Sequence, residues 1–344
     1  MNVKGKRIFV GLSGGVDSAV TAALLKEAGA DVVGVFIKGW YPPNLTCTWA
    51  ADRRDAMRVA ARLFIPFHTL DASAAYKKSV IDYLLSEYSQ GRTPNPDIMC
   101  NRDVKFGAFY SFAMEQGADA IATGHYAIAK DGHVYRGVDP EKDQSYFLWA
   151  VAKEALEKTL FPLGTYKKSE IRTLAKRFNL PVAEKKDSQG ICFLGAVSVD
   201  DFLRDEFHPE PGSAVDREGK TIGTHDGAVL RTLGERVALT DAAPGPWYVV
   251  RKDIAKNLLV VSKEKMTVVQ DATIRIKHTN WFTPVTNNEP LEAQYRYHGP
   301  KVSGTFHIST DTFTPTDELP EPIASGQSLV IYRDAECVGG GIIT

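Results

Sequence analysis

The first half of the chain alternates short apolar runs with stretches of helical periodicity. The apolar runs lie at 7–12, 31–37 and 118–122. Three stretches repeat apolar residues at helical offsets of about 0, 3, 4, 7 and 8, which places them on one helix face. They are Val16, Ala19, Val20, Ala23 and Leu24; Ala56, Val59, Ala60, Leu63 and Phe64; and Phe106, Phe109, Tyr110, Ala113 and Met114. This alternation predicts β-α-β units in a doubly wound parallel sheet, an α/β fold.

The pattern changes near 202–212, where short β-type runs with turn residues between them take over. Runs of this kind lie at 247–250, 258–262, 273–276, 292–297 and 329–332. A chain of 344 residues is too long for one ordinary core. We therefore expect three domains: an N-terminal domain at 1–204, a small β-rich domain at 205–268 and a closed C-terminal β-barrel at 269–344.

The motif Ser13-Gly14-Gly15-Val16-Asp17-Ser18 joins the first apolar run to the first helical stretch. Two glycines let the backbone come close to an anion, and the helix that follows offers unpaired N–H groups and the positive end of its dipole. The lysine of the common P-loop is missing, and Asp17 stands in its neighbourhood. A carboxylate there suits a metal ion on pyrophosphate, which predicts cleavage between the α and β phosphates of a nucleotide.

Composition excludes some classes of protein. The hydrophobic fraction of 44% and the charged fraction of 24% are typical of a globular protein, and no apolar run is long enough to span a bilayer. The first strand is expected too early for a signal segment, so we expect a cytoplasmic protein with no membrane partner. The four cysteines are far apart, without the spacing of a structural zinc site.

A basic run at 166–186 holds seven lysines and arginines but only two acidic residues, in a chain whose net charge is −1. Such a run is either a solvated helix face or a surface that contacts RNA.

Two polar segments carry cysteines that are candidates for chemistry. In Thr93-Pro94-Asn95-Pro96-Asp97-Ile98-Met99-Cys100-Asn101 the prolines predict a stiff loop that holds Asp97 close to Cys100. In Lys185-Lys186-Asp187-Ser188-Gln189-Gly190-Ile191-Cys192-Phe193 the cationic setting favours a thiolate on Cys192. Cys47 and Cys337 are expected to be small buried residues instead.

Together these motifs resemble those of the bacterial tRNA-specific 2-thiouridylases, within the wider group of PP-loop ATP pyrophosphatases. The resemblance spans nearly the whole chain. It is carried by Gly11–Ser18, Asn95–Cys100, Ala122–Tyr126, Lys142–Leu148, Asp187–Phe193, Pro246–Val249 and Gly339–Gly341. One departure is Glu235, where the family has glutamine between a glycine and an arginine, and it puts an RNA contact at that point in doubt.

The resemblance implies a tRNA with a wobble uridine as substrate, ATP and Mg²⁺ as cofactors, and a sulfur donor protein as partner. O2 of the uridine would attack the α-phosphorus, and a persulfide on Cys192 would then supply sulfur, directly or as hydrosulfide released by Cys100. Both routes end in a Cys100–Cys192 disulfide, which a cellular reductant must reset.

The resemblance also assigns residues to the site. ATP would be bound by Gly11, Leu12, Ser13, Gly14, Gly15, Val16, Asp17, Ser18, Ile37 and Gly124. The target base would meet Asn95, Pro96 and Asp97, with Asp97 as acid/base or hydrogen-bonding group. The tRNA would meet His125, Lys142, Asp143 and Gln144, and, from the barrel, Arg296, Tyr297 and Gln327. In a plainer interpretation, His125 only bonds at a strand end and Arg296 with Tyr297 is an exposed strand pair.

Two other functions stay open on the residues alone. A PP-loop ligase that adenylates a small molecule would need no cysteine pair, and its pyrophosphate release would depend on a metabolite and not on tRNA. A non-enzymatic RNA-binding or thiol-relay protein would show no ATP–pyrophosphate exchange.

Overall fold

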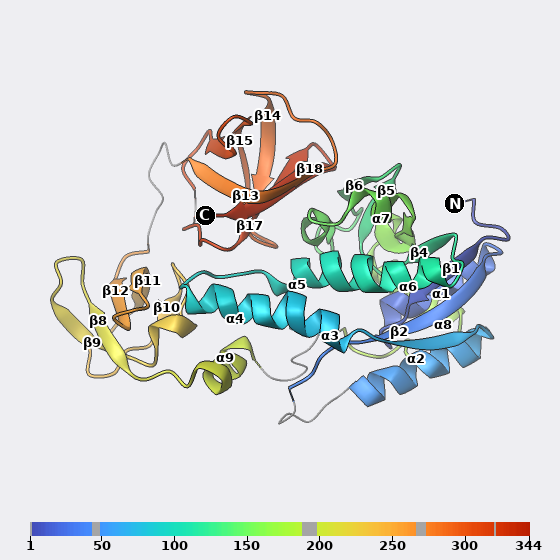
Figure 1. Ribbon diagram of the computed structural model, residues 1–344, viewed down its shortest axis with the longest axis horizontal. Coiled ribbons are helices and arrows are strands. Elements are labelled where there is room, and N and C mark those ends of the chain that lie inside the picture. The colour runs from blue at the N-terminus through green and yellow to red at the C-terminus, as the bar shows by residue number, and fades with distance from the viewer. Residues whose placement is uncertain (1, 43–48, 188–197, 266–272, 320) are drawn as a thin grey trace.

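The computed structural model describes residues 2–42, 49–187, 198–265, 273–319 and 321–344. A parallel sheet with its helices, a small second sheet and a β-barrel follow one another along the chain, and two long helical arms connect them (Figure 1). The predicted α/β sheet followed by two β-rich parts is confirmed.

The N-terminal sheet is parallel throughout, in the order β3-β2-β1-β4-β7. Its strands are β1 (Arg7–Gly11), β2 (Asp31–Lys38), β3 (Phe67–Asp71), β4 (Ala120–Ala122) and β7 (Thr159–Leu160). The apolar runs form the central strands because both faces of this sheet are covered. The chain order reverses between β1 and β4, so the crevice at their carboxyl ends is where such a sheet binds ligands.

Helices cover the two faces of this sheet in two separate cores. One face packs against α1 (Val16–Glu27), α2 (Trp49–Leu63) and α8 (Lys168–Arg177). Shorter elements complete this part: η3 (Ser145–Leu148), α7 (Lys153–Glu157) and η4 (Pro162–Thr165). Among the described residues, no helix combines the length and the apolarity that crossing a membrane requires.

The other face packs against two helical arms that run side by side toward the second sheet (Figure 1). The first arm is α3 (Ser73–Tyr76), η1 (Lys77–Ile81) and α4 (Asp82–Ser89), and the second is α5 (Pro96–Met99), η2 (Cys100–Ala108) and α6 (Phe109–Glu115). Both η1 and η2 are π-helical, a geometry often found at functional sites.

The second arm corrects one expectation, because Asp97 and Cys100 lie on a helix and not on a loop. Asn95 is the N-cap residue, and its side-chain oxygen accepts a hydrogen bond from the Asp97 N–H at 3.2 Å. Pro96 takes the first helical position, where its fixed φ favours a helix and its missing N–H costs nothing. The pair Asn-Pro therefore starts the helix that the prolines were expected to prevent.

The second sheet forms a small unit in the order β10-β11-β12-β8-β9. Its elements are α9 (Val199–Phe207), β8 (Gly212–Val215), β9 (Thr221–His225), η5 (Ala228–Leu230), β10 (Arg236–Val237), β11 (Trp247–Asp253) and β12 (Leu258–Ser262). Trp247, Val249, Leu259 and Val261 lie in its core.

The C-terminal strands close into a barrel because the first pairs with the last. The strands are β13 (Ile274–Trp281), β14 (Pro290–Gln294), β15 (Lys301–His307), β16 (Thr312–Pro315), β17 (Ser328–Arg333) and β18 (Glu336–Ile343). They follow the order β13-β16-β15-β14-β17-β18, which confirms the expected closed barrel.

A hairpin from the N-terminal part extends the barrel sheet, which the sequence did not predict. Strands β5 (Ala127–Lys130) and β6 (His133–Arg136) pair with each other, and β6 then pairs with the first two residues of β18. The same edge of β18 goes on to pair with β13. The barrel is thus joined to the N-terminal part by main-chain hydrogen bonds.

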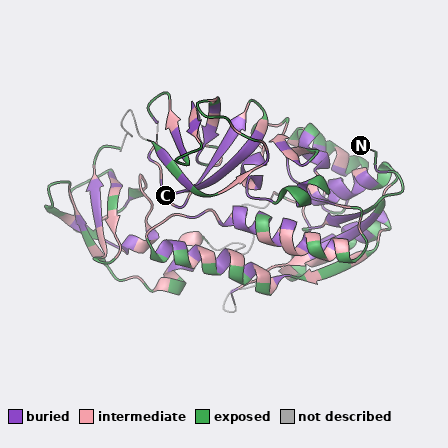
Figure 2. Ribbon diagram, turned by 45° about the horizontal axis from the view of Figure 1, so that its top comes forward, coloured by how far each residue is buried: buried purple, intermediate pink, exposed green. Residues whose placement is uncertain are grey.

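Arg136 stands at this joint. Its guanidinium lies 2.6 Å from Glu292 and 3.6 Å from Asp143 and covers the ring of Tyr332 at 3.5 Å. Val330 and Tyr332 of the barrel belong to the same buried cluster as the helical arms. Figure 2 shows buried residues running from the arms into the barrel strands. The outer face of the barrel therefore shares a buried cluster with the N-terminal part, while the barrel interior has a core of its own.

We predict that Arg136→Met lowers the free energy of unfolding by about 3 kcal/mol, because Glu292 and Asp143 lose a cation in a largely buried place. Arg333→Met is the matched control, since Arg333 pairs with Glu289 at the more exposed rim and should cost no more than about 1 kcal/mol. Urea unfolding followed by tryptophan fluorescence measures both. Equal losses of unfolding free energy in the two variants would show that Arg136 stabilises the joint no more than Arg333 stabilises the rim.

Candidate functional site

The turn between β1 and α1 leaves the start of α1 open. Gly15 is the N-cap residue and no side chain caps the helix. The hydroxyl of Ser18 accepts a hydrogen bond from the Ser13 N–H at 3.2 Å and donates one to the Gly15 carbonyl at 3.2 Å, which fixes the turn. The first-turn N–H groups and the helix dipole are thus available to an anion.

Two glycines are required here by close approach. Gly14 has φ +79°, and a Cβ on it would lie 2.3 Å from the carbonyl oxygen of Asp52 at the start of α2. A Cβ on Gly124, just after β4, would lie 2.9 Å from the backbone of Asp17 and Ser18. The crevice at the ends of β1 and β4 is therefore lined by backbone.

Ile37 and Gly11, which were expected to line the nucleotide pocket, lie together near this turn. A Cβ on Gly11 would stand 3.8 Å from Cδ1 of Ile37 and 3.6 Å from the ring of Phe109. The helix that continues from Cys100 thus packs beside the nucleotide loop.

The basic run at 166–186 divides between the nucleotide loop and the outer surface. Lys168 contacts Asp17 at 2.8 Å and Asp187 at 2.9 Å. Lys185 donates to the Gly14 carbonyl at 3.1 Å and contacts Asp52 and Asp55, each at 2.8 Å. The sequence analysis treated the run only as a helix face or an RNA surface. The contacts of Lys168 and Lys185 with the nucleotide loop could be found only from the folded structure, because their partners are distant in the sequence.

Other members of the run stay away from the loop. Arg177 pairs with Glu27 at 2.7 Å, and Lys176 pairs with Glu184 at 3.1 Å, both at exposed positions. Arg172 binds Asp187 beside Lys168. The run is therefore partly a solvated face and partly the wall of the nucleotide site.

Charges at the loop are held in their ionised forms. Burial alone would raise the pKa of Asp187, but the Lys168 ammonium and neighbouring cations lower it. Burial alone would lower the pKa of Lys185, but Asp52 and Asp55 raise it. Tyr126 donates to Asp17 at 2.8 Å, and burial together with this carboxylate raises the pKa of the phenol. A phosphate here would meet the Lys185 ammonium in its charged form.

Asp17 is the residue that fits a metal ion. Its carboxylate is about one-third exposed at 31% and stands beside the open helix start. In the described part of the chain, no three His, Cys, Asp or Glu residues gather into a metal-binding group. A single carboxylate is compatible with Mg²⁺, which commonly takes one or two carboxylates and completes its shell with phosphate oxygens and water.

Asp97 and Cys100 are three residues apart on one helix, so they face the same side. Asp97 keeps some solvent exposure, yet burial of its carboxyl raises its pKa, and the nearby Lys105 only partly offsets this. Cys100 is 4% exposed. The two residues thus share a helix where a loop was expected. Cys192 lies outside the described residues.

His125 connects this helix to the nucleotide crevice. Its Nε2 lies 3.2 Å from the Asn101 side-chain oxygen, and its Nδ1 lies 2.6 Å from the Thr123 hydroxyl. The ring is buried between Phe106 and Phe161. Burial and Lys105 keep its pKa well below the usual value, so His125 is neutral. Because Gly124 abuts Asp17, this contact places Cys100 beside the nucleotide loop.

The residues expected to meet tRNA near Lys142 have unequal exposure. Lys142 reaches Asp187 at 3.5 Å and keeps 40% of its side chain exposed. Asp143 accepts hydrogen bonds from the Gly137 and Ser145 N–H groups, and Gln144 accepts one from Tyr126 N–H, so both hold local backbone.

Residues expected to meet tRNA from the barrel lie over the same region. Tyr297 packs on Phe147, with ring centroids 4.3 Å apart, and burial raises its pKa to about 12, with contributions from Asp143 and Asp97. Arg296 pairs with Glu321 at 2.8 Å and remains exposed. Gln327 donates from Nε2 to the Thr93 carbonyl at 3.0 Å. Tyr297 thus reaches the neighbourhood of Asp97, while Gln327 is engaged with the backbone before Asn95.

Glu235, the departure from the family motif, serves the protein itself. It pairs with Arg231 at 2.8 Å and accepts from the Thr232 N–H at 2.8 Å.

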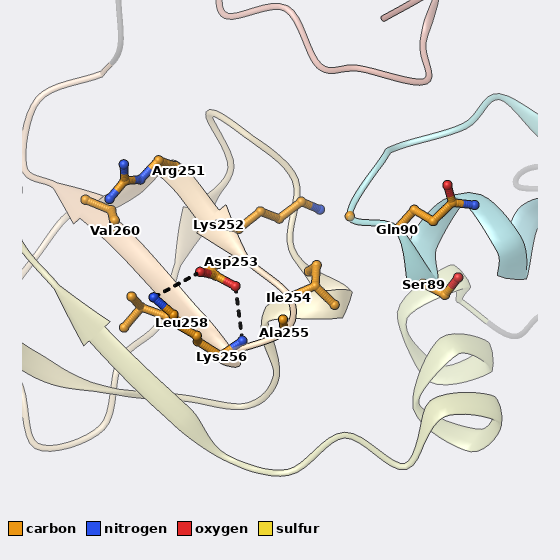
Figure 3. Close-up of a pocket in the computed structure, with 11 residues that line it drawn as sticks. Ser89, Gln90, Arg251, Lys252, Asp253, Ile254, Ala255, Lys256, Leu258 and Val260 are labelled. Carbon is orange, nitrogen blue, oxygen red and sulfur yellow. Dashed lines mark hydrogen bonds and ion pairs between the residues drawn. The ribbon is translucent and has the colours of Figure 1, made fainter.

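A separate groove lies between the end of the first arm and the β11–β12 hairpin (Figure 3). Ser89, Gln90 and Gly91 line one side, and Lys252 and Ile254 line the other. Burial lowers the pKa of Lys252 to about 8. None of the sequence-predicted site residues lines this groove.

The fold and the glycine-lined crevice define a nucleotide-binding α/β protein of the PP-loop kind, with two β domains added. Its three parts match the families described as tRNA methyl transferase HUP domain over residues 6–196, tRNA methyl transferase PRC-barrel domain over 200–263, and aminomethyltransferase beta-barrel domain over 271–343.

Curated relatives identify the family more closely. The chain is 41% identical to the tRNA-specific 2-thiouridylase MnmA of Stutzerimonas stutzeri (strain A1501), over 98% of this chain and 94% of that protein. It is 40% identical to the protein of the same name from Enterococcus faecalis (strain ATCC 700802 / V583), over 98% of this chain and 95% of that protein. The chain belongs to the tRNA-specific 2-thiouridylase family.

We predict that Asp97→Asn stabilises the protein at neutral pH. The folded-state pKa of Asp97 lies above the ordinary value of 3.8. Between the two pKa values the folded state binds more protons than the unfolded state, so stability falls as pH rises through that window. The variant should therefore resist urea better than the parent at pH 7, and the gain should vanish at about pH 3, below the unfolded pKa.

Asp187→Asn is the matched control, and its expected effect on stability at pH 7 is the opposite. The folded-state pKa of Asp187 is lowered, so its contribution to stability is present above the unfolded pKa and is lost as pH falls. This variant should be less stable than the parent at pH 7. If Asp97→Asn also lost stability there, the carboxylate of Asp97 would not be disfavoured by its surroundings.

Proposed function

We propose that this protein uses ATP to convert the wobble uridine of tRNA into 2-thiouridine. The observation that carries the proposal is the 3.2 Å contact between His125 and Asn101, because it puts the helix of Asp97 and Cys100 beside the glycine crevice. Activation by a nucleotide and exchange of sulfur can then take place in one site.

ATP is needed because the C2 oxygen of uracil is a poor leaving group. In the proposed first step, O2 attacks the α-phosphorus and pyrophosphate leaves. The open start of α1 and the cations Lys168 and Lys185 would stabilise the negative charge on the phosphates. Asp17 would hold Mg²⁺, which supplies a Lewis acid for the pyrophosphate.

Sulfur enters in the proposed second step. The terminal sulfur of a Cys192 persulfide attacks C2, and AMP leaves with the former O2. The Cys100 thiolate then attacks the inner sulfur of Cys192, which breaks the sulfur–sulfur bond and leaves the electron pair on the thiouridine. A Cys100–Cys192 disulfide results, and a dithiol reductant returns it to two thiols. In the alternative route Cys100 attacks first and frees hydrosulfide.

The target uridine must leave its stack to reach this site. Asn95, Pro96 and Asp97 would meet the base, since they begin the helix that carries Cys100. Tyr297, packed at a tilt against Phe147, offers an aromatic surface to unpaired RNA, and the exposed Arg296 and Lys142 suit phosphates. The persulfide requires a sulfur donor protein as a second partner.

Chemistry favours thiolation over the methyl transfer that two of the family descriptions mention. Methyl transfer from a preformed methyl donor needs no phosphate activation of the acceptor. An open helix start surrounded by Asp17, Lys168 and Lys185 suits the release of pyrophosphate. We therefore assign ATP-dependent sulfur transfer.

We predict that Cys100→Ser and Cys192→Ser each abolish 2-thiouridine formation while ATP binding stays near normal. The reason is that each thiol takes part in sulfur exchange and neither contacts the nucleotide in the proposed steps. The assay incubates tRNA with the protein, ATP, Mg²⁺ and a sulfide source, and analyses the nucleosides by mass spectrometry.

Cys337→Ala is the control, because Cys337 is buried where β18 pairs with β6 and should leave thiolation intact. Pyrophosphate release must depend on tRNA and not on free metabolites, which separates this function from that of a small-molecule ligase. Native-rate thiolation by either serine variant would remove that cysteine from the mechanism.

A further inference from the structure

The loop before Asn95 is held by the barrel through its main chain. The Thr93 N–H donates to the Ser325 carbonyl at 2.8 Å, and the Gln327 side-chain amide donates to the Thr93 carbonyl at 3.0 Å. Both polar main-chain atoms of Thr93 are therefore bound to a turn that lies more than two hundred residues away in the sequence.

Gly326, between these two partners, packs directly on the loop. It has φ +93°, and a Cβ on it would lie 3.0 Å from the Thr93 nitrogen and 3.0 Å from the Arg92 Cβ. The turn is itself fixed to the last barrel strand, since Gly326 N–H donates to the Ile343 carbonyl at 2.9 Å and Ile343 N–H donates to the Gln327 carbonyl at 2.8 Å. The surface that meets Thr93 is thus rigid.

A second connection reaches Asn95 from the same stretch of barrel. The Tyr146 hydroxyl donates to the Ser328 carbonyl at 3.0 Å and lies close to the Asn95 side chain. Asn95 in turn caps the helix at Asp97. A shift at Thr93 or Tyr146 would therefore be transmitted to the side chain expected to meet the base.

The other end of the loop is fixed independently. The Arg92 guanidinium binds the Glu87 carboxylate at 2.6 Å, and the Arg92 N–H donates to the Glu87 carbonyl at 2.9 Å. With Arg92 held by the first arm, the position of Asn95 depends on what holds Thr93.

We propose that the barrel turn Ser325–Gln327 positions the loop that leads to Asn95 and to the start of the helix carrying Asp97, and that Gln327 is a positioning residue that acts through Thr93. This inference rests on the proposed function, and it gives the barrel a part in the chemical step in addition to RNA binding. Gln327 was expected to contact tRNA, but its amide donor is directed to the protein backbone.

The test compares Gln327→Met and Gly326→Ala in the full-length protein, with 2-thiouridine formation measured against tRNA concentration. Met keeps the length of Gln but cannot donate to Thr93. Ala places a methyl group against the Thr93 backbone. Each variant should lower kcat at least tenfold and leave the KM for tRNA within twofold, because a misplaced Asn95 and Asp97 slow the reaction of tRNA that is already bound.

Gly219→Ala is the matched control. Gly219 also has a positive φ, +86°, but a Cβ there would meet nothing within 4 Å. Both alanine substitutions put a side chain on a residue with positive φ, but the one at Gly219 does not touch the loop at Thr93. This variant should keep the parental kcat and KM.

A second measurement does not depend on activity. Alkylation of Cys100, mapped by peptide mass spectrometry, should become at least fivefold faster in Gln327→Met and Gly326→Ala, while Cys337, buried at the β6–β18 joint, should react as slowly as in the parent. Faster alkylation of both cysteines would mean general unfolding and would overturn the positioning role.

The remaining outcomes are also decisive. A raised KM with an unchanged kcat would make Gln327 a tRNA contact and overturn the proposal. Parental kinetics and alkylation in both variants would do the same. Failure of the proposed function is seen separately, because the parent protein itself would then form no 2-thiouridine.

Discussion

The site depends on keeping the first turn of α1 uncapped while backbone closes in on it from both sides. Gly14 and Gly124 allow that approach, one toward Asp52 and the other toward Asp17 and Ser18. An uncapped helix start in a crevice concentrates partial positive charge, and the neighbouring Lys168 and Lys185 add to it. Carboxylates balance these cations within the protein, so the crevice can exist without a bound anion and still present a strong field to one.

Two kinds of contact attach the barrel to the N-terminal part, and each has a different role. The β6–β18 pairing and Arg136 fix where the barrel stands relative to the parallel sheet. The hydrogen bond between Thr93 and Ser325 then holds the short loop before Asn95 against the barrel. A helix start that depends on one asparagine cap gains accuracy from such support, because the cap alone stabilises by only about 1 kcal/mol.

The sequence predicted most of the fold and the glycine turn of the candidate site, for identifiable physical reasons. Period-two and period-3.6 patterns report burial directly, so the parallel sheet, α1 and the barrel strands were expected correctly. The helix at Pro96 was missed because prolines were read as breakers, although Asn-Pro is also a helix start. Lys168, Lys185, Arg136 and the β5–β6 hairpin were missed as site or joint residues because their partners lie far away in sequence, where periodicity carries no information.

The balance of charge around Asp97 bears on its proposed role as an acid/base or hydrogen-bonding group. Burial pushes its pKa up, and Lys105 is the cation that opposes this. His125 stands 3.4 Å from Lys105, but it adds little to the effect of that cation, because burial keeps the imidazole neutral. If His125 were charged, a second cation near Asp97 would favour the carboxylate and return its pKa toward the ordinary value. The buried, neutral histidine therefore ties the Cys100 helix to the nucleotide crevice without adding a second cation that would lower the pKa of Asp97.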